Sequence, residues 1–351
     1  MQLSRVALLT ASSLLPVIAL AAGCGSSATP GAGGADGAGG ATTSGPGPGS
    51  SSSTGDFDAG AKITTVARNM SPDTVQPGKE NTQCVTVNLN NPEGAYVRRI
   101  RADLSAGSHH LVAYTSSKTV EDPVPKDCQP FSGILNGEHP IFIAQQPHAS
   151  LEFPADESGT PVGFEIPAHQ MVKLEMHYIN TGKFPLSVMG KISFDTVPLS
   201  TVVTKSDLAF WGTTQINIPP NSVGDTGVLY QRALAGTKTF ALTTHQHQLG
   251  TEMLVWYGEG ANDPNKTQVA DGKSWADPPV ELFPTPLDFP TNGSNTLSTK
   301  GLAFQCKWNN TTPNTVTFGE SFNDEMCFVW QYYYPSQGFQ LCLSGFCTNT
   351  P

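Results

Sequence analysis

Short runs rich in β-branched and aromatic residues, separated by glycine, proline and asparagine, recur along most of this chain. Examples lie at 84–89, 111–114, 172–178, 238–242, 253–257, 315–318 and 327–334. Runs of this length and composition are typical of β-strands, and helical periodicity is scarce. The 35 glycines and 28 prolines suit a chain with many turns. The pattern therefore predicts an all-β fold of antiparallel β-sandwiches rather than a parallel sheet with crossover helices.

The N-terminal segment has the features of an export signal. Arg5 supplies positive charge, residues 6–22 are mostly apolar, and small residues precede Cys24. This pattern predicts a signal peptide over 1–23. The context of Cys24 resembles a bacterial lipobox, in which the cysteine is lipidated and becomes the mature N-terminus, although Ala21 stands where leucine is usual. We expect an exported protein that is lipid-anchored in the bacterial cell envelope. Ordinary cleavage near Ala21 would instead give a secreted protein.

Residues 24–60 consist almost entirely of glycine, serine, alanine, threonine and proline. Such a segment buries too little apolar surface to fold, so we expect a flexible linker with a reach of roughly 30–35 Å. The remaining residues, 61–351, suffice for two ordinary domains. We place the boundary near residue 200, which gives an N-terminal domain over 61–200 and a C-terminal domain over 201–351.

Charge and cysteine content narrow the possible partners and the compartment. The net charge of -10 and the lack of any basic run argue against nucleic-acid binding. With Cys24 set aside, six cysteines remain, and an even number in an exported chain indicates three disulfides among fifteen possible connectivities. We expect the pairs Cys84–Cys128, Cys306–Cys327 and Cys342–Cys347. The last pair is local in sequence, and each of the first two lies within one half of the chain.

Six side chains suited to metal binding lie in four short patches, and five of the eight histidines are among them: His109, His110, His177, His245, His247 and Met326. Three precede residue 180 and three follow residue 240, which suggests one metal site on each half. Imidazole together with a thioether favours copper, because soft sulfur prefers Cu(I) to zinc, magnesium or calcium.

The spacing within each patch sets a geometric condition. His245 and His247 are alternate residues, so in a strand they point the same way. His109 and His110 are adjacent and would diverge in a flat strand, so they could share a metal only at a bend. Gly107 just before them could supply that irregularity.

Some of these residues are weak signals when each is taken alone. A single histidine such as His177 is more often a structural side chain, and Met326 could be ordinary core filler. The acidic pair Asp324 and Glu325 could be solvated turn residues, so we assign them no catalytic role.

The four patches together, with their flanks, resemble the copper type II, ascorbate-dependent monooxygenases, which include peptidylglycine α-hydroxylating monooxygenase and dopamine β-monooxygenase. The matching segments are Gly107-Ser-His-His-Leu-Val, Leu174-Glu-Met-His-Tyr, Thr244-His-Gln-His-Gln-Leu-Gly and Asp324-Glu-Met-Cys. They occur in the family's order between about Cys84 and Tyr334.

The resemblance implies two jelly-roll sandwiches with one copper on each, two ions per chain, facing a solvent-filled cleft. It implies that His109, His110 and His177 hold a copper that relays electrons from ascorbate or another one-electron donor. It assigns His245, His247 and Met326 to the catalytic copper, which binds O₂ and substrate and hydroxylates a C–H bond. It also implies that a Cys306–Cys327 bridge anchors the strand beside Met326.

The substrate does not carry over from the resemblance. Thr243 and Trp330 stand where the peptide-amidating members have an arginine and a tyrosine, which argues against a peptide carboxylate. If Met326 starts a strand, then Phe328, Trp330 and Tyr332 share its face. We expect Thr243, Phe328 and Trp330 to line a pocket for a small apolar or aromatic molecule, with core packing as the alternative. We expect a monomer whose only membrane contact is the lipid anchor.

Other functions fit less well. No histidine follows His247, so the second half of a cupin metal motif is missing. The even cysteine count leaves no obvious free thiolate for a blue-copper centre, and no H-E-x-x-H zinc motif or phosphate-binding glycine loop occurs. An envelope copper-binding or storage protein that uses the same ligands without turnover remains the alternative.

Overall fold

The computed structural model describes residues 62–71, 74–135 and 137–350. The expected signal peptide over 1–23, the lipidated Cys24 and the linker over 24–60 lie outside these residues. Strands and their turns make up nearly all of the described chain, and its one short α-helix is α1 (Ser132–Leu135). The prediction of an all-β fold is confirmed. No described helix has the length and apolarity needed to cross a membrane.

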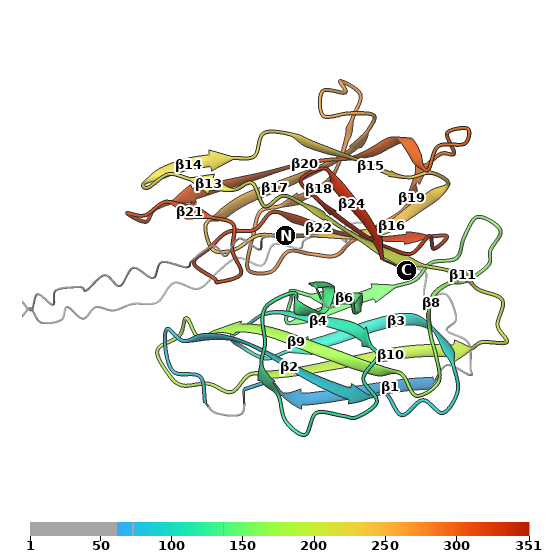
Figure 1. Ribbon diagram of the computed structural model, residues 1–351, viewed down its shortest axis with the longest axis horizontal. Coiled ribbons are helices and arrows are strands. Elements are labelled where there is room, and N and C mark those ends of the chain that lie inside the picture. The colour runs from blue at the N-terminus through green and yellow to red at the C-terminus, as the bar shows by residue number, and fades with distance from the viewer. Residues whose placement is uncertain (1–61, 72–73, 136, 351) are drawn as a thin grey trace, which may run out of the picture. The chain divides into compact units, whose positions relative to one another are not determined.

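The first half of the described chain forms two sheets (Figure 1). The order in one is β5-β2-β9-β4-β6, which we call the first inner sheet; the other, the first outer sheet, is β1-β10-β3-β8-β11 with β7 on β3. The strands are β1 (Lys62–Asn69), β2 (Glu80–Asn88), β3 (Ala95–Leu104), β4 (Ser108–Ser116), β5 (Lys126–Asp127), β6 (His139–Ala144), β7 (His148–Glu152), β8 (Val162–Ile166), β9 (Met171–Ile179), β10 (Met189–Pro198) and β11 (Thr204–Lys205).

The second half repeats this two-sheet plan. The second inner sheet has the order β19-β16-β22-β12-β23-β24, the second outer sheet is β14-β20-β17-β18 with β15 on β20, and β13 pairs with β21. The strands are β12 (Asp207–Gly212), β13 (Asn217–Ile218), β14 (Ser222–Asp225), β15 (Leu229–Leu234), β16 (Thr237–His245), β17 (Gly250–Gly258), β18 (Thr267–Gly272), β19 (Glu281–Phe289), β20 (Leu297–Asn310), β21 (Val316–Thr317), β22 (Phe328–Tyr334), β23 (Phe339–Leu343) and β24 (Phe346–Thr350).

Strand pairing is antiparallel within both halves, with two parallel exceptions. β12 runs parallel to β23, and β11 runs parallel to β8. The second pairing assigns Thr204 and Lys205 to the first half, so the sheets change over near residue 206 rather than at the expected residue 200. The twist of the strands sets the angle at which the two sheets of each sandwich pack. The many glycines and prolines allow the short turns between strands.

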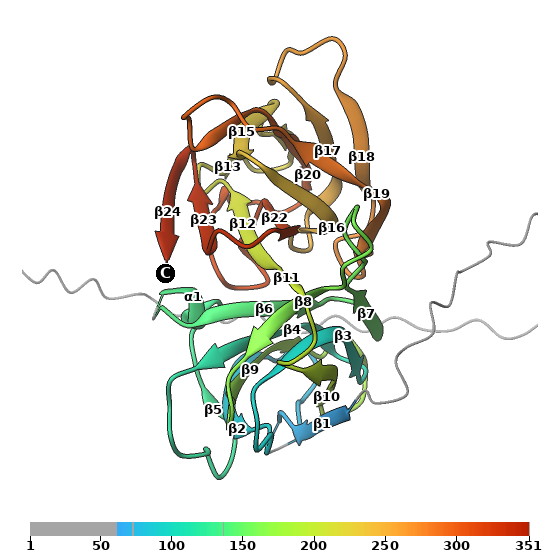
Figure 2. The ribbon, with the colours of Figure 1, turned by 90° about the vertical axis from the view of Figure 1, so that its right-hand side faces the viewer.

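The two inner sheets pack directly on each other (Figure 2). One continuous core cluster holds side chains of both halves, such as Phe142 of β6 with Phe240 and Tyr332 of the second inner sheet. At this junction the Tyr332 hydroxyl oxygen accepts a hydrogen bond from the Ile143 N–H at 3.2 Å. Where these aromatic residues meet, packed side chains rather than the solvent-filled cleft implied by the family resemblance lie between the halves.

All three expected disulfides are confirmed. Cys84–Cys128 joins β2 to the segment before α1, Cys306–Cys327 joins β20 to the residue before β22, and Cys342–Cys347 closes the β23–β24 hairpin. The first bridge lies in the first sandwich and the second lies directly beside Met326. Each bridge removes conformational freedom from the unfolded chain, which stabilises the folded protein.

Candidate metal centre

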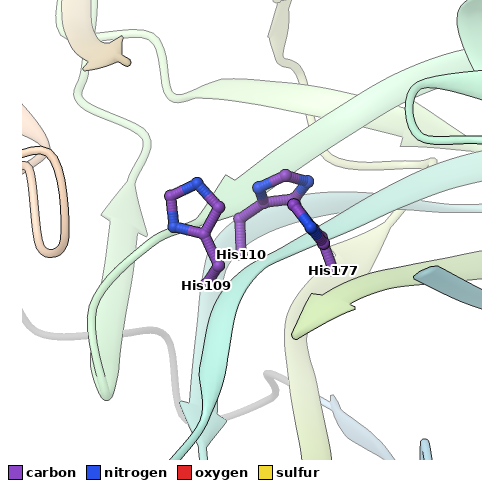
Figure 3. Close-up of side chains that lie close together, drawn as sticks. All are labelled: His109, His110 and His177. Atoms are coloured by element: carbon purple, nitrogen blue, oxygen red, sulfur yellow. The ribbon is translucent and has the colours of Figure 1, made fainter. Parts of the chain in front are cut away.

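The adjacent histidines of the first half lie at a β-bulge. In the pairing of β4 with β9, Ser108 lies opposite Tyr178 and His110 lies opposite His177, so His109 is an extra residue in β4. The preceding Gly107 has a φ of 86°, and a Cβ there would lie 2.9 Å from a Leu186 methyl. Only glycine fits this bend without strain. The bulge turns both rings toward His177, as Figure 3 shows.

The histidines of the second half are held at the end of a strand. β16 ends at His245, and His247 follows in the turn that leads to β17. The alternation expected within a strand therefore does not extend to His247. Two contacts hold His247 in place instead. Its ring Nδ1 lies 3.1 Å from the Asp324 carbonyl oxygen, and its backbone N–H donates to the Glu325 carboxylate. The centroids of the His245 and His247 rings lie 5.3 Å apart.

The five histidines converge on one place rather than forming two separated sites. The His109 ring centroid lies 5.1 to 5.5 Å from those of the other four histidines. Two groups of three rings have ligand atoms within 4.8 Å of one another: His109, His110 and His177, and His109, His245 and His247. His109 belongs to both groups, so the structure brings the histidines expected for the two sites next to one another.

Burial keeps His109, His110, His245 and His247 neutral. All five histidines are at most 3% exposed. Burial, with the neighbouring histidines adding to it, lowers the pKa of His109, His110 and His245 well below the ordinary 6.5 and that of His247 to about 4. A metal binds the neutral imidazole, so at neutral pH no proton has to be displaced from His109, His110, His245 or His247.

The hydrogen-bond partners determine which ring nitrogen is left for a metal. His245 Nδ1 lies 2.6 Å from Gln145 Oε1, His247 Nδ1 faces Asp324 O, and His177 Nε2 lies 3.0 Å from Glu80 Oε1. Their other nitrogens, and both nitrogens of His109 and His110, are buried without a hydrogen-bond partner in the described part of the chain. Buried unpaired ring nitrogens are costly unless they coordinate a metal, so this donor set fits one.

Two polar residues of the first half also bind groups of the second. Glu80 accepts the Phe322 N–H at 2.6 Å as well as facing His177. Burial alone would raise the pKa of Glu80, but these two hydrogen bonds outweigh it and lower the pKa, so the carboxylate stays ionised. Gln145 donates to Thr243 Oγ1 at 3.1 Å and to the Thr244 carbonyl at 2.8 Å. Each residue thus orients one histidine and ties the halves together.

Glu325 is not the solvated turn residue that the sequence suggested. It is fully buried, and its carboxylate accepts N–H groups of Leu249 at 2.7 Å, His247 at 3.1 Å and Trp308 Nε1 at 2.8 Å. Burial raises the pKa of Glu325 to about 7. The Met326 N–H lies 3.3 Å from the same carboxylate. Glu325 therefore binds the His247 turn to the segment that carries Met326, which is 1% exposed.

The aromatic stripe after Met326 shares one face, as expected, but that face is packed against protein. β22 begins at Phe328, and Phe328, Trp330 and Tyr332 all belong to the core cluster between the inner sheets. Thr243 lies opposite Trp330 in the pairing of β16 with β22. The three residues expected to line a pocket are therefore neighbours of the histidines, although each is buried in this structure.

Sequence reasoning missed several neighbours of the histidines. Phe131 stacks on His110 at 5.2 Å, and Trp275 lies 5.6 Å from His109. Glu80 and Gln145 also had no local signal, because each acts on a residue about 100 positions away. The resemblance in flanking residues could identify ligands but not these partners.

The neutral buried histidines predict an acid-sensitive metal-free protein. Below pH 6.5 these histidines bind protons in the unfolded chain but stay neutral in the folded chain, so the free energy of unfolding decreases as pH falls. Each of His109, His110, His245 and His247 should cost about 1 kcal/mol of stability between pH 7 and 5.5. Glu175 and Glu325, whose pKa values are raised to about 7, act in the opposite direction, so the test compares variants.

Urea unfolding in chelator at both pH values measures this loss. His110→Gln should reduce the loss by about 1 kcal/mol, whereas His148→Gln, at an 84% exposed side chain, should leave it unchanged. An equal loss in His110→Gln and the unaltered chain would contradict the burial argument.

Comparisons with known proteins agree with the donor chemistry in the second half. Residues 215–350 match the sequence profile of the copper type II ascorbate-dependent monooxygenase, C-terminal domain. No curated protein matches the chain.

Solved structures resemble the chain only distantly. The major capsid protein P2 of bacteriophage PM2 is 12% identical with a TM-score of 0.33, covering 81% of this chain and 100% of its own. The glycosylasparaginase PNGase F of Flavobacterium meningosepticum is 8% identical with a TM-score of 0.28, covering 74% of this chain and 100% of its own. These likenesses are too weak to bear on function. Residues 215–350, which carry His245, His247 and Met326, form a C-terminal domain of the copper type II ascorbate-dependent monooxygenase family.

Proposed function

We propose that this protein is a copper-dependent monooxygenase that hydroxylates a C–H bond of a small organic molecule. The observation that carries the proposal is the convergence of five buried histidines with unpaired ring nitrogens, three of them outside the segment that matches the family. A match to the C-terminal domain alone does not imply a second metal site on the first half of the chain. The bulge at His109, which brings His109 and His110 beside His177, supports a partner site on the first sandwich.

His109, His110 and His177 would hold one copper, and His245, His247 and Met326 a second, with His109 close enough to serve either group. Copper would supply the one-electron chemistry and the binding of O₂, and a thioether ligand favours Cu(I). In the balanced reaction, R–H, O₂, two electrons and two protons give R–OH and water. Ascorbate or another one-electron donor supplies the electrons one at a time, so two donor molecules are oxidised per turnover.

The protein side chains orient and shield this chemistry. Gln145 and the Asp324 carbonyl fix His245 and His247 with Nε2 free, while Glu80 fixes His177 with Nδ1 free. Fixing the tautomer and ring direction of a ligand through a hydrogen bond on its other nitrogen strengthens metal binding. The packed inner sheets exclude water, which limits the wasteful release of reduced oxygen.

The proposal includes the compartment and the substrate class. A signal peptide and a lipidated Cys24 would place the enzyme in the bacterial cell envelope, where its three disulfides are stable. The Thr243 and Trp330 positions favour a small apolar or aromatic substrate over a peptide. We propose that the protein acts as a monomer.

The rival function is copper binding or storage without turnover, and oxygen uptake distinguishes the two. The full chain is loaded with copper, supplied with ascorbate, and its O₂ uptake is measured against free copper at the same concentration. An oxygenase should consume O₂ faster than free copper once a substrate is present. A storage protein should bind the copper and consume O₂ no faster than free copper does.

A further inference from the structure

One aromatic side chain from outside both groups, Phe131, lies against His110 and His245. Phe131 lies between the Cys84–Cys128 bridge and α1, and it is 7% exposed. Its ring stacks on His110 at 5.2 Å with an interplanar angle of 21° and meets the His245 ring edge-on at 5.7 Å. Phe131 thus touches one histidine of each half.

The other side of the Phe131 ring faces the aromatic residues of the second inner sheet. Its centroid lies 6.0 Å from Phe210, 6.0 Å from Trp330 and 6.4 Å from Phe328. Five rings therefore surround one ring, at separations typical of favourable stacked and edge-to-face pairs. These five rings could pack equally well around the planar ring of a bound ligand.

Trp330 supplies a second, independent observation. Its indole Nε1–H is fully buried and has no hydrogen-bond partner among the described residues. A buried unpaired donor costs more free energy than a paired one, and native proteins rarely keep one without a reason. A ligand that carried a hydrogen-bond acceptor into this surround could satisfy it, which the Phe131 ring cannot do.

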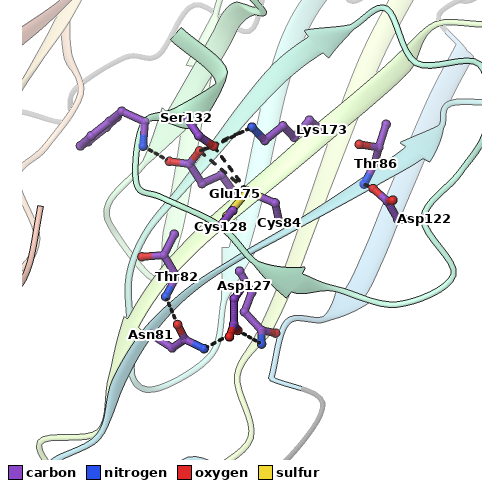
Figure 4. The surroundings of a disulfide bond; sticks show 12 residues. Asn81, Thr82, Cys84, Thr86, Asp122, Asp127, Cys128, Ser132, Lys173 and Glu175 are labelled. Carbon is purple, nitrogen blue, oxygen red and sulfur yellow. Dashed lines mark hydrogen bonds and ion pairs between the residues drawn. A yellow bond between two sulfur atoms is a disulfide. The ribbon is translucent and has the colours of Figure 1, made fainter. Parts of the chain in front are cut away.

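The backbone at Phe131 is held in a strained form. Its φ is 55°, in the left-handed region that bulky residues avoid. The Phe131 N–H donates to buried Glu175, whose carboxylate also accepts from Ser132 Oγ at 3.2 Å. Lys173 donates to the same Ser132 hydroxyl at 2.8 Å, beside the Cys84–Cys128 bridge, as Figure 4 shows. One carboxylate thus restrains a residue that prefers another conformation.

We propose that Phe131 occupies the substrate's place, and that the substrate presents a planar aromatic ring with a hydrogen-bond acceptor. This inference rests on the proposed function and adds the substrate class. Entry requires residues 129–131 to swing outward, about the fixed point at Cys128, with loss of the Phe131–Glu175 hydrogen bond. The incoming ring then packs against His110 and His245, and its acceptor receives the Trp330 N–H.

Ligand binding to copper-free protein tests this without any turnover. Toluene and benzaldehyde are ring-matched probes that differ in a carbonyl acceptor, and their affinities are measured by calorimetry. Phe131→Ala should bind both probes at least tenfold more tightly than the unaltered chain, because the competing ring is gone. It should also prefer benzaldehyde by about tenfold, the effect of one net hydrogen bond.

Two further variants separate a specific place from a mere hole. In Phe131→Ala/Trp330→Phe the preference for benzaldehyde should vanish. Phe142→Ala, which empties an equally buried phenylalanine position in the same core cluster, should show no preference between the probes. If Phe131→Ala does not fold, Phe131→Leu replaces it and should show the same preference with a smaller gain in affinity.

The inference is overturned if the Phe131 variants bind neither probe, or bind both without preference, since Phe131 would then be a fixed wall of the core. That result would leave the oxygenase proposal standing, because copper binding and O₂ uptake are measured separately. Conversely, loss of the oxygenase proposal would leave a ring-binding place whose preference is still measurable.

Discussion

Replacing Met326 with isoleucine is expected to lower turnover at least 100-fold while the chain keeps the copper held by His109, His110 and His177. Isoleucine matches the volume of methionine closely, so the buried position should tolerate it. It lacks the thioether that favours Cu(I), the form that must meet O₂. Losing an outer-shell partner of a metal costs about 10–100-fold, so losing a ligand should cost at least the upper end of that range.

Steady-state O₂ uptake and copper content together check this result. Met253→Ile is the matched control, because Met253 is equally buried in the second half but belongs to the other core cluster. It should retain turnover within about twofold, since a volume-conserving core change is well tolerated. Full activity in Met326→Ile would contradict the assignment of Met326 as a ligand.

Replacing His109 with alanine should weaken copper binding by both groups of rings at once. His109 is the only histidine that belongs to both three-ring groups of the described chain. If it serves both, its loss should lower affinity at each by at least roughly 100-fold and abolish turnover. Under a competing chelator, bound copper should fall from two ions per chain to fewer than one.

His110→Ala and His148→Ala provide the comparison. His110 belongs to one group, so its loss should remove one copper and leave the other, while the exposed His148 should have no effect. If His109→Ala lost one copper only, as His110→Ala does, the two groups would not share a ring.

The sequence was sufficient where the signal is local. Alternation and turn residues predicted the strands. The even cysteine count, with one local pair and the other two each kept within one half of the chain, predicted all three bridges. The condition that His109 and His110 need a bend, with Gly107 to supply it, is met by the bulge in β4. The strands and the bend depend on residues within a few positions of one another, so they can be predicted from the sequence.

The remaining features depend on contacts between distant segments. Glu325 resembles a turn residue until Leu249, His247 and Trp308 surround its carboxylate. His177 acquires its orientation from Glu80, 97 positions away, and His245 from Gln145, 100 positions away. The merging of two expected sites into one cluster, and the position of Phe131 within it, follow from the packing of the inner sheets. No local pattern encodes that packing.

The central claim is that one oxygen atom of O₂ enters a C–H bond of a small molecule, and isotope labelling tests it most directly. The copper-loaded full chain is given ascorbate, ¹⁸O₂ and a panel of small aromatic and aliphatic compounds, and the products are analysed by mass spectrometry. The account predicts at least one product that carries a single ¹⁸O atom, formed in a 1:1 ratio to O₂ consumed. Oxygen uptake that yields only hydrogen peroxide or water, with no labelled product from any compound in the panel, would contradict it.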